Sequence, residues 1–203
     1  MNIKNVMLII IILTVPYLIL FGNFLFYFYN EDFYYKQFEK NNVNVEGKKN
    51  ILDNLLNFFN GNEDLDYFNE NERLHLIDVK NLINKFITAF YIVLILDILL
   101  LIILFTRFRK FLKKNISKIL LYSGSLTIFV MFIFLILSLN FDFLFDNFHR
   151  LFFAGNWLFP EESLLIQLFP FEFFRDYFLK ILTDSFLVSV IFVLIGLYTK
   201  NSE

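Results

Sequence analysis

Four long apolar stretches dominate the pattern of hydrophobic and polar positions along the chain. They cover about residues 6–28, 86–106, 119–139 and 181–198. A helix rises about 1.5 Å per residue, so about 20 apolar residues are needed to cross a hydrocarbon core about 30 Å thick. The pattern therefore predicts an all-α membrane protein built on a four-transmembrane-helix bundle. The fourth stretch is the weakest of the four, because Asp184 lies near its start.

Basic residues indicate the orientation of the predicted helices. The connection at residues 107–118 carries six Lys or Arg residues and no acidic one, and short loops this basic stay in the cytoplasm. Four spans then place the N- and C-termini in the cytoplasm, and the segments 29–85 and 140–180 form a small extracytoplasmic cap. The first stretch is too long for a signal peptide and lacks a small-x-small cleavage site, so we expect an uncleaved helix. Residues 1–203 are expected to form a single membrane domain. The abundance of Phe, Asn, Ile, Leu and Lys is typical of an AT-rich bacterial genome, so a bacterial cell membrane is the expected location.

The first cap segment is predicted to be mainly helical, with short β pairing as an alternative within residues 29–70. One helix is expected near Lys48–Asn60, ended by Gly61, since glycine readily adopts the left-handed conformation found at helix ends. Asn69 and Glu72 have the spacing of a capping box. The helix that follows them is expected to continue directly into the second span.

The second cap segment alternates bulky aromatic residues with polar ones, as amphipathic helices do at the level of the lipid headgroups. Gly155, Pro160 and Pro170 divide this segment into pieces that are too short to cross a membrane. The two segments together are expected to form a compact cap.

The amino-acid composition agrees with this fold and excludes some kinds of catalytic and metal-binding site. Hydrophobic residues make up 58% of the chain and the mean hydropathy is +0.60, whereas soluble domains are about 45–50% apolar. The chain has no cysteine, which excludes disulfides, thiol nucleophiles and thiolate metal sites. A net charge of −2 gives no indication of a nucleic-acid partner. The 31 phenylalanines are interpreted as lipid-facing or core residues.

The two histidines, His75 and His149, are the first candidates for chemistry, because both fall in the predicted cap segments. Histidine is the side chain best suited to moving protons near neutral pH, although a single histidine is more often a surface or interfacial residue. Asp78 follows His75 by three positions, so it would lie beside His75 on a helix and fix the tautomer of its ring. The alternative pairs Asp78 with a basic neighbour, Arg73 or Lys80.

Asp97 lies near the middle of the second predicted span. A charge at that depth costs about 2.5–3.5 kcal/mol on insertion scales, so we expect a protonated or hydrogen-bonded carboxyl group inside the bundle. Hydroxyl groups of the third span are the expected partners, namely those of Ser123, Ser125 or Thr127. A structural role is favoured for Asp97.

Other catalytic motifs are absent from the sequence. It contains no Gly-x-Ser-x-Gly, P-loop, Gly-x-Gly-x-x-Gly or His-Glu-x-x-His pattern. No cofactor and no metal site are predicted. Two histidines with carboxylates leave a zinc-dependent membrane hydrolase as the least favoured alternative. A second alternative is a non-catalytic membrane protein that uses an aromatic cap to bind lipid or to scaffold a partner.

Three sequence blocks resemble the bacterial lipoprotein intramolecular transacylase family, whose members have four spans and an outer cap. The blocks are LNFFNG (56–61), ERLHLIDVKNL (72–82) and FHRLFFAGNWLF with LLIQLFPFEFF (148–174). The resemblance implies an acyltransferase that acts on lipoproteins whose N-terminal cysteine carries a diacylglyceryl thioether. Such an enzyme moves the acyl chain from the second glycerol position onto the α-amine of that cysteine and so gives the lyso form. The expected partners are this lipoprotein substrate and membrane lipids.

The resemblance also implies that His75 and His149 are catalytic. His149 is assigned as the base that frees the amine, with His75 orienting it or relaying protons and Asp78 supporting His75. Nucleophile and ester belong to one molecule, which explains why no Ser or Cys nucleophile is needed. Where the family tends to carry an Asp before a Leu-Ile-x-x-Phe-Pro stretch, this chain has Ser163 and Leu164. Candidate donors to the oxyanion or headgroup are Lys80, Arg150, Asn156 and Trp157.

Overall fold

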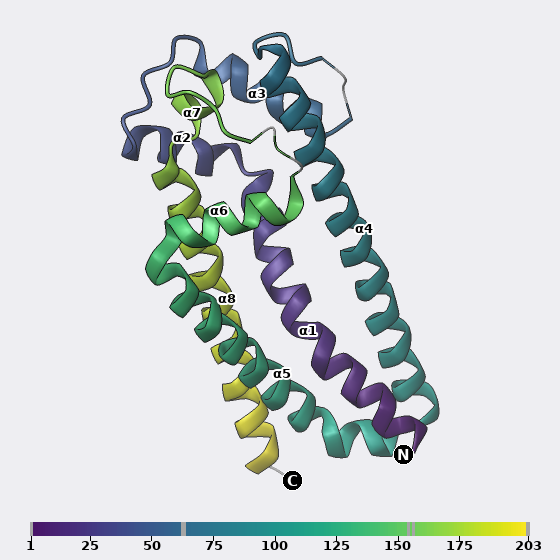
Figure 1. Ribbon diagram of the computed structural model, residues 1–203. Helices are drawn as coiled ribbons and strands as arrows, with labels where there is room; N and C mark the ends of the chain where they lie inside the picture. The colour runs from purple at the N-terminus through teal and green to yellow at the C-terminus, as the bar shows by residue number, and fades with distance from the viewer. Residues whose placement is uncertain (1, 62–63, 154, 156, 202–203) are drawn as a thin grey trace. The chain divides into compact units, whose positions relative to one another are not determined.

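The computed structural model describes residues 2–61, 64–153, 155 and 157–201, and these residues are almost entirely helical. The helices, shown in Figure 1, are α1 (Ile3–Phe28), α2 (Glu31–Lys40), α3 (Lys48–Phe59), α4 (Glu70–Arg107), α5 (Arg109–Leu137), the 3-10 helix η1 (Ser138–Asn140), α6 (Phe141–Phe152), α7 (Leu164–Leu168) and α8 (Phe171–Asn201). No strand occurs in the described part of residues 29–70, so the β pairing allowed there is not found.

The chain divides into two compact units. The spanning unit consists of Met1–Phe26, Ile87–Leu139 and Leu179–Glu203, and the loop unit consists of Tyr27–Phe86 and Asn140–Phe178. These limits lie close to the predicted division between spans and cap segments.

Four helical stretches are long and apolar enough to cross a membrane: Ile3–Phe28, Glu70–Arg107, Arg109–Phe152 and Phe171–Asn201. The prediction of four spans is therefore confirmed. α4 starts at Glu70, so the helix that follows the capping box continues directly into the second span, as predicted. α8 also begins before its predicted apolar stretch, directly after Pro170. Hydropathy marks the part of a helix that matches the lipid thickness, and the helix itself continues into more polar sequence.

The basic connection differs from its prediction as a loop over residues 107–118. α4 ends at Arg107, only Phe108 leaves the helical conformation, and α5 begins at Arg109. Lys and Arg are good helix formers, so a basic segment can extend a helix rather than interrupt it. The Lys4 ammonium lies 5.1 Å from the centre of the Phe108 ring, so α1 begins beside this turn.

The buried carboxyl group of Asp97 contacts α1 rather than α5. Its two oxygens lie 2.9 and 2.8 Å from Thr14 Oγ1, and the Asp97 side chain is only 4% exposed. Thr14 Oγ1 donates to this carboxyl group and also lies 2.8 Å from the Ile10 carbonyl oxygen. The expected hydrogen-bonded carboxyl group inside the bundle is thus found, and the prediction of a partner on the third span was wrong.

Two glycines allow α5 and α8 to approach closely. A Cβ atom on Gly124 would lie 2.7 Å from the Ser189 carbonyl oxygen, and one on Gly196 would lie 2.8 Å from the Leu121 backbone nitrogen. Helices in lipid associate through tight packing, which small residues permit. A Cβ atom on Gly196 would also lie 3.0 Å from the Ser117 carbonyl oxygen, so the last turns of α8 lie beside the first half of α5.

We expect Gly124→Ala and Gly196→Ala to lower the thermal unfolding temperature of the detergent-solubilised protein, because the added methyl group meets backbone atoms. Overpacking of this kind costs about 1–3 kcal/mol. Gly22→Ala is the matched control, since its Cβ would meet only the Phe90 ring, at 3.9 Å. Equal stability of all three variants would contradict the close approach of α5 and α8.

The loop unit has an aromatic core in which α2 packs against the segment that begins α8. The ring of Tyr34 stacks on Phe173 at a centroid distance of 5.6 Å. Its hydroxyl donates a hydrogen bond of 3.0 Å to the Phe28 carbonyl oxygen, and burial raises the pKa of Tyr34 well above its usual value. Tyr34 therefore remains a neutral donor.

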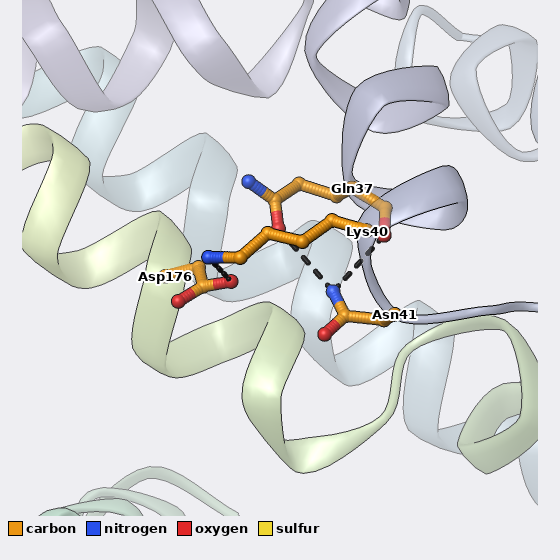
Figure 2. Close-up of polar contacts among 4 residues, drawn as sticks. All are labelled: Gln37, Lys40, Asn41 and Asp176. Carbon is orange, nitrogen blue, oxygen red and sulfur yellow. Dashed lines mark hydrogen bonds and ion pairs between the residues drawn. The ribbon is translucent and has the colours of Figure 1, made fainter.

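A polar contact at the end of α2 supports this packing (Figure 2). The Lys40 ammonium forms an ion pair of 2.6 Å with the Asp176 carboxylate of α8. Next to it, the Asn41 amide donates to the backbone and side-chain oxygens of Gln37. Lys40 is mostly exposed, so the ion pair contributes little energy by itself; its effect is to fix where α2 ends.

The smaller helices of the loop unit follow their predicted signals. Gly61 has a φ of +120° just after the α3 C-cap residue Asn60, as predicted for a helix ended by glycine. Gly155, Pro160 and Pro170 separate α6, α7 and α8, so the predicted division of the second segment is confirmed.

Candidate functional site

His75 lies in the second turn of α4, and a capping box fixes the start of that helix. The Asn69 side-chain oxygen accepts a hydrogen bond of 3.1 Å from the Glu72 backbone nitrogen. In return, Glu72 Oε2 accepts one of 3.0 Å from the Asn69 backbone nitrogen. The predicted capping box is confirmed. It determines where α4 begins and therefore which face of the helix carries His75.

The same Glu72 side chain joins α4 to α7. Its second oxygen, Oε1, accepts a hydrogen bond of 3.0 Å from the Leu165 backbone nitrogen, and the residue is only 1% exposed. A carboxylate near a helix N-terminus is favoured by the helix dipole as well as by the hydrogen bond. Ser163 caps α7 by accepting a hydrogen bond from the Ile166 backbone nitrogen. A serine can thus serve as the cap residue in the region where the resemblance led us to expect an acid.

His149 lies near the end of α6. Its Nδ1 atom is 2.7 Å from the carbonyl oxygen of Phe145, one helical turn earlier. A carbonyl oxygen only accepts hydrogen bonds, so Nδ1 carries a hydrogen. The neutral ring therefore keeps its lone pair on Nε2, where it can act as a base.

The two imidazole rings lie side by side within the loop unit. Their centroids are 6.2 Å apart and their planes differ by 22°, and both side chains are 9% exposed. α4 and α6 thus bring together two residues that are remote in the sequence. The predicted convergence of His75 and His149 is observed, and their catalytic roles stay a proposal.

Aromatic rings surround this pair, and we call Phe145, Phe148, Phe153, Trp157 and Phe159 the aromatic enclosure. Phe153 contacts both histidines, with ring centroids 4.9 Å from His75 and 5.5 Å from His149. Phe159 lies 5.4 Å from His75. The Phe145, Phe148 and Trp157 rings lie 4.1, 5.6 and 5.1 Å from that of His149. Charge is poorly solvated among such side chains, so this environment favours uncharged imidazole rings.

The other predicted site residues lie in different environments. Trp157 belongs to the enclosure. Asp78 follows His75 on α4 with an exposed side chain, and Arg150 of α6 is also exposed. The Lys80 ammonium lies 4.1 Å from the centre of the Phe58 ring of α3. Asn156 lies outside the described residues, so its expected role stays a prediction, as do those of the other donors.

Sequence reasoning missed several residues of the site. Phe145, Phe153 and Phe159 were interpreted as lipid-facing or core residues, and Glu72 was recognised only as one half of a capping box. The spacing of Phe145 and His149, four positions apart on one helix, was the signal available in the sequence. Within the described residues, no group of three or more His, Cys, Asp or Glu side chains is placed to hold a metal ion.

Comparison with known proteins gives the family of this architecture. The family model described as lipoprotein intramolecular transacylase Lit matches residues 3–174. No curated protein is significantly similar to the chain.

Solved structures share the fold. The membrane integral lipoprotein intramolecular transacylase Lit from Bacillus cereus has a TM-score of 0.83 and 24% identity, with 98% of this chain and 96% of that chain covered. Two variants of that protein, with one histidine replaced by arginine or by alanine, have TM-scores of 0.79 and 23% identity. They cover 98% of this chain and 92% and 94% of their own.

Replacing Glu72 by alanine is expected to loosen α7, because the backbone nitrogens of Asn69 and Leu165 both lose their acceptor. The Leu165 nitrogen is buried, and leaving such a donor without a partner costs about 1–3 kcal/mol. Hydrogen exchange measured by mass spectrometry should then become faster in the α7 peptide. Glu70→Ala, at an exposed position in the first turn of α4, is the control. Unchanged exchange in Glu72→Ala would contradict the assigned link.

Proposed function

The chain belongs to the lipoprotein intramolecular transacylase family. We propose that it moves an acyl chain within one lipid-modified substrate, onto the N-terminal amine of that substrate. The substrate is a bacterial lipoprotein whose N-terminal cysteine carries a diacylglyceryl thioether. The acyl chain at the second glycerol position moves to the cysteine α-amine, which gives the lyso form. The observation that supports this most is the pair of imidazoles 6.2 Å apart inside an aromatic enclosure.

The proposed reaction exchanges an ester for an amide. An α-amine has a pKa of about 8, so it is mostly protonated at neutral pH and needs a base to react efficiently. Once the ammonium form has released one proton to solvent, the neutral amine nitrogen attacks the ester carbonyl carbon while His149 Nε2 takes a second proton from that nitrogen. When the bond from the carbonyl carbon to the glycerol oxygen breaks, the imidazolium returns the proton to this oxygen. Ester and amine thus become amide and alcohol, with no proton gained or lost.

The contact between His149 and Phe145 supports this assignment of the base. A hydrogen bond from Nδ1 to the Phe145 carbonyl oxygen orients the ring, selects the tautomer with a basic Nε2 and stabilises the imidazolium that forms. His75, beside it, orients His149 or relays the proton, and Asp78 supports His75. Trp157, Asn156, Lys80 and Arg150 remain the proposed donors to the oxyanion or the headgroup.

Proximity supplies much of the proposed rate. Well-oriented intramolecular reactions reach effective molarities of about 10⁵–10⁸ M, and in this substrate the amine and the ester are attached to the same cysteine. The protein therefore has to fold the glyceryl group back onto the amine and place a base beside it.

We also propose that both termini are cytoplasmic and that the histidine pair faces the extracytoplasmic side. The basic residues at 107–118 support this orientation through the positive-inside rule. The start of α1 lies beside the turn at Phe108 and the last turns of α8 lie beside the first half of α5. Both contacts agree with two termini on the basic side.

His149→Ala and His149→Gln are expected to lower the yield of lyso-form lipoprotein by about 10²–10⁴-fold, the usual contribution of a general base. The measurement is mass spectrometry of lipoprotein N-terminal peptides from cells that express each variant at equal levels, beside cells without the gene. Asn147→Ala, on the exposed face of α6, should make lyso peptides at the normal level.

His75→Ala is expected to reduce lyso peptides as well, because its ring lies against that of His149.

Unchanged diacyl peptides in cells that contain the unaltered protein would instead favour a non-catalytic lipid-binding or scaffolding protein. Activity that depends on an added metal and is lost with a chelator would favour the zinc-dependent hydrolase.

The orientation can be tested cleanly because the chain has no cysteine of its own. A cysteine in place of Glu46, exposed in the loop unit, should react with a membrane-impermeant maleimide in intact cells. A cysteine in place of Lys114, exposed near the start of α5, should react only after permeabilisation. The reverse labelling pattern would overturn the proposed orientation.

A further inference from the structure

Phe153 occupies a special position in the aromatic enclosure, because its ring lies against both imidazoles. Its centroid is 4.9 Å from that of His75 and 5.5 Å from that of His149, and the residue is 8% exposed. The backbone also holds it in place. The Phe153 nitrogen donates a hydrogen bond of 2.8 Å to the His149 carbonyl oxygen, and the chain leaves α6 here in an extended conformation.

The proposed reaction has a competitor that uses the same base. If water replaces the amine, its oxygen bonds to the ester carbonyl carbon and His149 passes the water proton to the glycerol oxygen. The products are then a free fatty acid and a lyso-glyceryl peptide whose amine stays unacylated. Ester hydrolysis and amine acylation differ only in which nucleophile lies beside the base.

Rings of the aromatic enclosure pack against the imidazoles beside which such a water would have to bind. A buried water needs a space of roughly one probe sphere and two to four polar partners, and the imidazole nitrogens would supply polar partners. Phe153 lies against both rings, and Trp157 and Phe159 lie against one each. The tethered amine reaches the base as part of the bound lipid, whereas free water is kept out by apolar contact.

We propose that Phe153 determines the reaction specificity of the site by excluding water from the histidine pair, with Phe159 assisting on the His75 side. This inference rests on the proposed acyl transfer. It makes the enclosure the feature that separates a transacylase from a lipoprotein esterase, and it predicts that removing the Phe153 ring opens an esterase activity.

The chain offers a matched control in the preceding residue. Phe152 belongs to the same turn of α6, but its ring lies 6.0 Å from Phe86 and 4.9 Å from Phe148, and the residue is 40% exposed. Phe152→Ala therefore removes the same side chain from a neighbouring position without opening the face that covers both histidines. Phe153→Leu keeps an apolar side chain at the critical position and serves as the rescue variant.

The test is the fate of the acyl chain. Purified full-length protein in lipid nanodiscs is incubated with a synthetic diacylglyceryl-cysteine lipopeptide in water enriched in ¹⁸O. Mass spectrometry then quantifies the N-acylated lyso peptide, the lyso peptide with a free amine, and ¹⁸O in the released fatty acid. Wild type, Phe152→Ala and Phe153→Leu are expected to give almost entirely N-acylated product. For Phe153→Ala the ratio of hydrolysis to transfer should rise about tenfold or more, a relative barrier change of at least about 1.4 kcal/mol.

The product ratio separates this role from a structural one. A Phe153→Ala protein that only turns over more slowly, with the ratio unchanged, overturns the proposal. If Phe153→Ala does not fold, the same ratio is measured in Phe159→Ala, whose ring contacts His75, and an unchanged ratio there overturns it as well. If the wild-type protein yields no N-acylated peptide, the proposed function fails before the question of water exclusion arises.

Discussion

The approach of two imidazole rings to 6.2 Å is the contact on which the account of this site depends, and ordinary helix chemistry produces it. A capping box at Asn69 and Glu72 sets the start of α4 and so the face that carries His75. The carboxylate that closes this box also accepts the Leu165 backbone nitrogen at the start of α7. On α6, the Phe145 carbonyl oxygen orients the His149 ring. Glu72 and His149 are both buried, and each is stabilised by a hydrogen-bond partner of complementary chemistry.

The aromatic enclosure around the two histidines helps to explain how a chain without a thiol could catalyse acyl transfer. In the proposed reaction the substrate brings both nucleophile and ester, so the protein contributes a base, an orientation and a dry environment. Aromatic rings provide the dry environment at the end of α6. Phenylalanine is well suited to this because it carries no polar atom that would hold a water. In this proposal the enclosure is part of the chemistry as well as part of the packing.

The helices and their ends were predicted more accurately from the sequence than the side-chain contacts between helices. Hydropathy located the four spans, and the cap signals at Asn69 and Gly61 located helix ends, because these features depend on residues close together in the chain. It also predicted that His75 and His149 converge. The partner of Asp97 was predicted on the wrong helix, since the choice between Thr14 and the hydroxyls of α5 depends on how helices remote in sequence align. For the same reason the rings around the histidines were not distinguished from the other phenylalanines. The basic connection was predicted as a loop because charge was given more weight than helix propensity.

The central claim is that His75 and His149 act as one unit, and a double-mutant cycle tests it most directly. Initial rates of acyl transfer to a synthetic diacylglyceryl lipopeptide would be measured for the wild type, His75→Ala, His149→Ala and the double variant. Residues that work as a unit are strongly non-additive. The account predicts that the double variant is about as slow as the slower single variant. Losses that multiply would show that the two rings act independently and would contradict the account.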